Sequence, residues 1–119
     1  MTDEIIAALE SDRTIDITTT GRQSGQPRRK EMWFHNVDGR IFITGLPGRR
    51  DWYANLLADP SFTFHLKESV RADLDATARP VATVDEKREI LEILLPRIGH
   101  LDKIERWLTD GPLVEVSFA

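Results

Sequence analysis

The segment from Val70 to Arg79 alternates apolar and polar residues at every position. Its apolar members stand two positions apart, and they are Val70, Ala72, Leu74, Ala76 and Ala78. Successive side chains of a β-strand point to opposite faces, so this period predicts a strand with one buried face and one face in water. Strands of this kind are typical of antiparallel sheets.

Five other segments have strand-like patterns: Thr14–Thr20, Arg29–Val37, Arg40–Gly45, Ser61–Lys67 and Leu113–Phe118. Asp38-Gly39 is predicted to form a hairpin turn between two of them, because glycine accepts the positive φ that tight hairpins need. About six antiparallel strands with inserted helices predict a mainly β fold with helices (α+β), a small barrel in a single domain over residues 1–119.

Four helices are predicted between these strands. They are Thr2–Glu10 with Thr2 as its cap, Trp52–Ala58 capped by Asp51, a helix that begins at a T-x-x-E capping box of Thr83 and Glu86, and a short helix with Leu101, Ile104 and Leu108 before Gly111-Pro112. The third helix carries an apolar stripe of Ile90, Leu91, Leu94, Leu95 and Ile98.

The chain contains no cysteine, which excludes a disulfide scaffold, a zinc ribbon and a thiol nucleophile. No apolar run approaches the roughly 20 residues that cross a bilayer. The first residues, Met1-Thr2-Asp3-Glu4, are acidic where a signal peptide is basic. We therefore expect a cytoplasmic protein without a membrane span.

Positive charge is concentrated in one segment of an otherwise acidic chain. Seven arginines and lysines and only two acidic residues lie between Thr20 and Arg50, although the net charge of the whole chain is −4. General binding of nucleic acid or of a membrane surface usually needs a dominant positive charge. The distribution instead favours a site that holds one small anion.

Motifs of hydrolytic or metal-dependent catalysis are missing. His35, His65 and His100 lack metal-ligand spacing, so no metal site is predicted, and His35 and His65 are interpreted as structural histidines within strands. Asp73 and Asp75 share a strand face with Arg71 and Arg79, which is typical of a solvated, charge-balanced surface. Trp107 is interpreted as an anchor in the core or in an interface.

Two loops remain as candidates for the anion site. The first, Gly21-Arg22-Gln23-Ser24-Gly25-Gln26-Pro27-Arg28-Arg29, combines glycines, a hydroxyl and planar guanidinium groups that match phosphate oxygens. The second, Gly48-Arg49-Arg50-Asp51-Trp52, places two arginines before a helix N-terminus. The two loops could grip a phosphate from two sides of one barrel mouth. The alternative is two exposed turns with solubilising arginines.

The same loops resemble a known family. Thr18-Thr19-Thr20-Gly21-Arg22-Gln23-Ser24-Gly25-Gln26-Pro27-Arg28 is similar to the T-T-x-G-R-K-S-G-x-P-R signature of the deazaflavin (F420)-dependent nitroreductase/quinone reductase family. Trp52-Tyr53-Ala54-Asn55-Leu56-Leu57-Ala58-Asp59-Pro60 resembles its W-x-x-N-L-x-A-x-P helix, and Gly111-Pro112-Leu113-Val114-Glu115-Val116 resembles its closing strand. The resemblance implies a split β-barrel like that of pyridoxamine-phosphate oxidase.

The resemblance also implies a cofactor site for coenzyme F420, with FMN as the second choice. Carried over by position, Arg22, Gln23, Ser24 and Arg28 would bind the phosphate and its tail, while Arg29, Lys30, Glu31, Met32 and Trp33 would run beneath the ring system. Gly45, Leu46 and Pro47 would flank the ring, and Asp51, Trp52, Tyr53 and Asn55 would close the pocket. Tyr53, the only tyrosine, is a weak candidate for a proton donor.

The implied activity is transfer of a hydride from reduced F420 to a small, hydrophobic, electron-poor acceptor such as a quinone, an activated alkene or a nitro compound. No catalytic dyad is needed, because the cofactor is itself the hydride donor. Gln23 replaces the lysine of the signature, and the second loop is short, so Arg49 and Arg50 are candidates to supply the missing charge.

These departures favour the alternative of a non-catalytic split barrel that binds FMN, haem, a lipid or a nucleotide. A scaffold domain is a third, weaker reading. The sequence leaves open whether the chain is a monomer or a homodimer.

Overall fold

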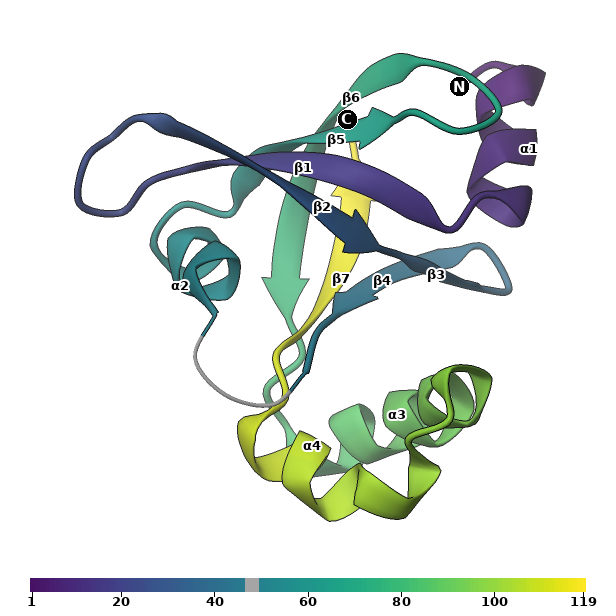
Figure 1. The fold of residues 1–119 in the computed structure, drawn as a ribbon, viewed down its shortest axis with the longest axis vertical. Helices are drawn as coiled ribbons and strands as arrows, with labels where there is room; N and C mark the ends of the chain where they lie inside the picture. Colours follow the sequence, from purple (N-terminus) through teal and green to yellow (C-terminus); the bar gives the residue numbers. More distant parts are fainter. Residues whose placement is uncertain (47–49) are drawn as a thin grey trace.

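The computed structural model describes residues 1–46 and 50–119, and Figure 1 shows their arrangement. The described strands form one antiparallel sheet of seven in the order β2-β1-β5-β6-β7-β4-β3. The strands are β1 (Thr14–Thr20), β2 (Pro27–Trp33), β3 (His35–Val37), β4 (Arg40–Thr44), β5 (Ser61–Leu66), β6 (Ala72–Pro80) and β7 (Leu113–Phe118). The helices are α1 (Asp3–Ser11), α2 (Asp51–Ala58), α3 (Val84–Ile98) and α4 (Ile104–Asp110), with a 3₁₀ turn at Leu101–Lys103.

The sheet curls into a half-barrel whose two faces belong to different hydrophobic cores (Figure 1). Ile41 and Ile43 of β4 point into the concave side, where they join Ile17 and Phe64. Phe42, which lies between them in the chain, points to the other side and packs under α3 and α4. Alternation along a strand therefore divides the apolar residues between a barrel core and a helix-covered core.

The strand expected over Arg29–Val37 is divided in two, and this accounts for the seventh strand. The break lies at Phe34, whose amide donates a hydrogen bond to the carbonyl of Arg13, at 2.9 Å. Its ring is buried and meets Phe64 edge to face, with 5.4 Å between the ring centroids. Packing of one aromatic side chain thus redirects the backbone, which the alternation pattern does not reveal. Asp38 and Gly39 have positive φ, which confirms the turn that follows.

One expected helix cap and one expected capping box are wrong, whereas Thr2 caps α1 as predicted through a hydrogen bond from the amide of Ile5. Asp51 is the first residue of α2 and not its cap, which is Arg50. Thr83 is the N-cap of α3, but its side chain makes no cap hydrogen bond. Glu86, the expected partner in the box, instead receives a hydrogen bond from Arg79 of β6.

The ion pairs that replace this box tie α3 to the sheet. Arg79 bridges Glu86 and Glu115, at 2.5 Å and 2.7 Å, and Arg40 donates to Glu115 at 2.8 Å. Hydrogen bonds from Arg40 and Arg79 lower the pKa of Glu115 to about 2. The guanidinium groups thus hold this carboxylate in its charged form, and they fix the outer end of the helical layer on β6 and β7.

The helical layer itself forms from the predicted apolar stripe. Ile90, Leu91, Leu94 and Leu95 are buried beneath α3, and Trp107 of α4 lies beside them at 1% exposure. Trp107 is therefore confirmed as a core anchor. None of the helices in residues 1–46 and 50–119 is both long and apolar enough to cross a membrane.

Candidate functional site

The loop between β1 and β2 is a tight turn held by its own backbone. The amide of Gly21 donates to the carbonyl of Gln26 and the amide of Gly25 donates to the carbonyl of Gly21, both at 2.8 Å. A Cβ atom at position 21 would lie 2.6 Å from Oγ of Ser24. The glycine at this position therefore allows the loop to fold on itself, in addition to any approach of a ligand.

Ser24 orients a cation of the first predicted loop. Its hydroxyl oxygen accepts a hydrogen bond from the amide of Gln26, at 3.2 Å, and lies 3.4 Å from Nη2 of Arg28. The side chain of Arg28 is exposed beyond this contact. Ser24 thus helps to position Arg28, whose guanidinium group keeps further N–H donors for a ligand.

Asn55 joins this loop to α2 from a buried position. Its side-chain oxygen accepts hydrogen bonds from the amide of Arg22, at 3.1 Å, and from Nη1 of Arg22, at 2.9 Å. Its side-chain nitrogen donates to Oγ1 of Thr19 at 3.3 Å. Because Asn55 is only 3% exposed, its amide acts within the protein. Asp51 adds a weaker, exposed ion pair to Arg22, at 3.4 Å.

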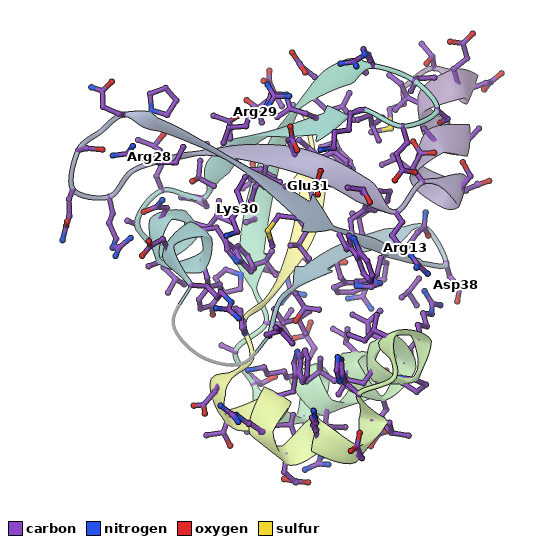
Figure 2. The ribbon with its side chains drawn as sticks, viewed as in Figure 1. Arg13, Arg28, Arg29, Lys30, Glu31 and Asp38 are labelled. Carbon is purple, nitrogen blue, oxygen red and sulfur yellow. The ribbon has the colours of Figure 1, made fainter. Side chains whose placement is uncertain are left out.

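The register between β1 and β2 decides on which face of the sheet each cation of β2 lies. Arg28 lies opposite Thr19 and Lys30 opposite Ile17, so these two side chains share the concave face with buried β1 residues. Figure 2 shows Arg29 and Lys30 on opposite sides of the strand. Arg29 pairs with Asp16 on the outer face, with 2.9 Å between Nε and Oδ2.

Glu31 also projects to the outer face, where it forms an ion pair with Lys67. Lys67 in addition donates to Asp16, which lowers the pKa of that carboxyl below its usual range. The side chains of Arg29 and Glu31 therefore have partners within the protein. Both residues nevertheless border the cavities of the concave face. They could contact a ligand there through their backbone groups, because β2 is an edge strand of the described sheet.

A first cavity of about 500 Å³ lies between the β1–β2 loop, β2 and α2, and we call it the cationic cavity. It brings together nine of the predicted site residues: Arg22, Gln23, Ser24, Arg28, Arg29, Lys30, Asp51, Trp52 and Asn55. The two loops that are separated in the sequence thus converge on one space. Three of its side chains, Arg22, Arg28 and Lys30, present positive charge on the concave side.

A second cavity of about 480 Å³ adjoins the first, and we call it the aromatic cavity. Trp52 and Lys30 line both cavities. The predicted residues Glu31, Met32, Trp33, Gly45, Leu46 and Arg50 line the second as well. Most of its exposed lining is apolar, which suits a flat, poorly hydrated ring.

Five residues of the aromatic cavity were missed by sequence reasoning: His35, Thr44, Ile98, His100 and Trp107. The last three come from the helical layer, at least 40 residues along the chain from α2. Trp107 stacks on His100, with 5.1 Å between ring centroids, and its Nε1 donates to Oγ1 of Thr44 at 3.2 Å. Ile98 and Trp107 follow the apolar spacing of helical core residues, and His100 lies between two helices, so no local signal marks them as wall residues.

A third cavity of about 930 Å³ lies on the other side of the α2 N-terminus. Tyr53 lines this cavity, and not the aromatic one, and its ring packs edge to face against Trp52. Lys87 lines it too, and burial lowers the pKa of its ammonium group, which donates to the carbonyl of Leu108 at 3.1 Å. The predicted site residues Pro47 and Arg49 lie outside the described residues.

His65, the other histidine of the predicted strands, links two polar side chains on the outer face of the sheet. His65 is buried, with its Nε2 2.7 Å from Oγ1 of Thr18 and its Nδ1 2.7 Å from Oδ1 of Asp73. The hydrogen bond from His65 lowers the pKa of Asp73. This agrees with a structural histidine. In the described part of the chain, no three histidine, aspartate or glutamate side chains are grouped to hold a metal ion.

His35 sits at the floor of the aromatic cavity in a neutral form. Burial, together with the weaker effect of the nearby cations Arg97 and Arg13, lowers its pKa from 6.5 to about 4. The uncharged ring therefore contributes stability that is complete above pH 6.5. This stability is lost progressively as the pH falls towards 4, because the unfolded chain binds the proton more tightly.

Replacing His35 with phenylalanine is expected to flatten this part of the pH dependence. Urea unfolding between pH 4 and pH 7 measures it, and the free energy of unfolding should fall by up to about 3 kcal/mol more in the wild type than in His35→Phe. Acidic groups with lowered pKa values lose stability in both proteins, so the difference isolates the histidine. An equal slope in the two proteins would contradict a neutral, buried ring.

A family model described as "F420H(2)-dependent quinone reductase" matches residues 3–99. This span includes both predicted loops and α2, together with nearly all residues of the two adjoining cavities. Of the described residues that line these cavities, His100 and Trp107 in the helical layer lie beyond it.

Solved structures with this fold differ widely in sequence. The heme storage protein HutZ from Vibrio cholerae superposes with a TM-score of 0.73 at 19% identity, over 98% of this chain and 88% of that one. A putative pyridoxamine 5'-phosphate oxidase from Listeria innocua gives 0.72 at 13% identity, over 98% and 91%. An FAD-binding protein from Mesorhizobium loti gives 0.71 at 14%, over 100% and 91%. At these identities the likeness shows the split-barrel fold alone.

Proposed function

Because the chain belongs to the F420H(2)-dependent quinone reductase family, we propose that it is an F420-dependent oxidoreductase. Its acceptor is a small, hydrophobic, electron-poor molecule such as a quinone, an activated alkene or a nitro compound. One observation carries the proposal: a cationic cavity continues into an aromatic cavity past Trp52 and Lys30. A ligand with an anionic tail and a flat ring matches this pair of environments.

The residues of the site fit F420, whose deazaflavin ring carries a phosphate and an acidic tail. Arg28 and Lys30 project from the concave face of β2, and Arg22 reaches the same cavity from the loop. Gln23 contributes no charge where the family signature has lysine, so these three cations supply the attraction to the phosphate. Trp33, Leu46 and Trp52 supply apolar surface for the ring.

The protein contributes positioning and an environment that excludes water. Ser24 orients Arg28, and Asn55 fixes Arg22, so two guanidinium groups are organised before a ligand arrives. Preorganised donors lose little freedom when they bind an anion. The bound cofactor, when reduced, supplies the hydride, and the cavity walls hold ring and acceptor together at low dielectric.

Replacing Arg28 with alanine is expected to weaken the binding of oxidised F420 by about tenfold or more. A hydrogen bond to a charged group contributes about 1.5–3 kcal/mol, and 1.4 kcal/mol is a factor of ten in affinity. Cofactor fluorescence during titration with protein measures the dissociation constant. Arg71→Ala is the matched control, because Arg71 is exposed and lines none of the three cavities described above.

The same titration distinguishes the proposed enzyme from a non-catalytic binder. We expect F420 to bind more tightly than FMN, and its affinity to fall between low and high salt because arginine–anion contacts are screened. Reduction of menadione by reduced F420, followed by absorbance, should then accompany binding. Micromolar binding of FMN or haem without binding of F420 would contradict the proposal and support the alternative.

A further inference from the structure

We propose that His100 is the catalytic acid of this site, and that it hydrogen-bonds and protonates an oxygen atom of an acceptor held in the aromatic cavity. The inference rests on the proposed function, and it assigns the proton that reduction of a quinone needs. It also places the acceptor against the wall that the helical layer forms. Neither Tyr53 nor a residue of the two predicted loops is given this role.

The wall opposite β2 is made by residues on either side of the turn between α3 and α4. Ile98 ends α3, His100 follows it, and Trp107 belongs to α4. His100 stacks on Trp107 with an angle of 30° between the rings, which fixes the plane of the imidazole. An imidazolium in this position is also stabilised by the face of the indole.

The ring nitrogens of His100 remain available for a ligand. Across residues 1–46 and 50–119, the contact found for this ring is the stacking on Trp107, and no hydrogen bond to it is present. Its side chain is half-buried, so a proton can return from solvent after transfer. A half-buried polar ring in a largely apolar cavity is well placed to orient an acceptor by one hydrogen bond.

The other hydrogen-bonding groups of the cavity are less suited to give up a proton. His35 is buried and neutral beside Arg97 and Arg13. The hydroxyl of Thr44 donates to the carbonyl of Pro112, at 2.6 Å, and accepts from Trp107. These groups are already committed within the protein.

Three further charged residues line the cavity: Lys30, Glu31 and Arg50. Glu31 is bound by Lys67, and Lys30 also borders the cationic cavity. Arginine does not deprotonate in proteins, which excludes Arg50 as a proton donor. Among the described residues, His100 therefore combines a place in the wall of the acceptor's cavity with ring nitrogens that make no hydrogen bond within the protein.

The chemical step balances with one hydride and one proton. A quinone that accepts a hydride gains two electrons and becomes a hydroquinone anion, and the reduced deazaflavin is oxidised in the same step. The N–H bond of the His100 imidazolium breaks, and its proton forms an O–H bond on the anionic oxygen. The product is a neutral hydroquinone, and the neutral imidazole regains a proton from water.

The test compares wild type with His100→Phe, which keeps a ring against Trp107, and with His100→Gln, which keeps a hydrogen-bond donor. Menadione is the acceptor probe, and His65→Gln on the outer face is the matched control. In His100→Phe we expect kcat/KM for menadione to fall about 100-fold, the lower end for a general acid. The kcat/KM of His100→Gln should lie between those of the wild type and His100→Phe.

Two readouts separate a catalytic from a merely structural role. The wild-type kcat/KM should decrease as the pH rises through the range in which an imidazolium loses its proton, and this decrease should be absent from His100→Phe. Without any F420, menadione should shift the imidazole ¹⁵N signals of His100 in NMR spectra and leave those of His65 unchanged. The second readout reports the contact itself.

A wild-type pH profile in His100→Phe, or a titration in which menadione leaves the His100 signals unmoved, would overturn the inference. The NMR titration needs no cofactor, so it still tests the acceptor contact where F420 fails to bind. Failure of F420 binding together with an intact menadione contact would contradict the proposed function and leave His100 supported as the acceptor contact.

Discussion

Trp107→Ala is expected to lower the free energy of unfolding by about 3–5 kcal/mol, the range for truncating a large buried aromatic side chain. Trp107 is 1% exposed and donates from Nε1 to Thr44, so the change leaves both a void and an unpaired hydroxyl oxygen. The void cannot close easily. A Cβ at Gly111 would lie only 2.4 Å from Cδ1 of the indole, which shows how tightly the chain folds over it.

Urea unfolding followed by circular dichroism measures this change. Trp33→Ala is the control, because Trp33 is 48% exposed and its ring packs against the guanidinium of Arg13, which lies 5.0 Å from the ring centroid. That variant should lose about 1 kcal/mol or less. Equal losses for the two tryptophans would contradict a helical layer that is anchored on Trp107.

Asn55→Leu is expected to lower the free energy of unfolding by about 1–3 kcal/mol and to weaken F420 binding by about tenfold or more. The leucine keeps the branched shape but leaves the amide of Arg22 and the hydroxyl of Thr19 without their buried partner. It also frees the guanidinium of Arg22, so ordering this side chain opposes binding. Urea unfolding and the F420 titration measure the two effects on the same protein samples.

Asp51→Asn provides the contrast on the other side of Arg22. The ion pair is 3.4 Å long and the Asp51 side chain is 92% exposed, so its removal should change the free energy of unfolding by less than about 0.5 kcal/mol. Asn55→Leu behaving like Asp51→Asn would show that the buried amide does not organise the loop. The pair thus compares two partners of one arginine that differ in burial.

Much of the fold follows from local patterns along the chain. The alternation from Val70 onward predicted β6 and its two faces, and the structure confirms that Ala76 and Ala78 are buried while Asp75 and Thr77 are exposed. Strand periodicity is a local property, because each side chain follows the pleat of its own backbone. The break at Phe34 was not predictable in this way, since it depends on Phe64 and on the carbonyl of Arg13.

The candidate site shows the same division. The composition of the two loops indicated a site for an anion, and the resemblance pointed to the same loops. The structure gathers most of the first loop together with Asp51 and Trp52 around the cationic cavity, whereas Arg50 lines the two neighbouring cavities. Which cations face that cavity was decided by register. Pairing of Arg28 with Thr19 places it on the concave face, and the next residue, Arg29, is thereby committed to Asp16 on the outer face.

The sequence by itself determined most of the strands, the helices and the identity of the two cationic loops, because these depend on residues close together in the chain. Only the tertiary structure decided that His100 and Trp107 form a wall of the aromatic cavity and that Asn55 holds Arg22. Such contacts join segments that are distant in the chain. They are set by how the sheet curls and how the helical layer packs on it, for which a single sequence carries no local signal.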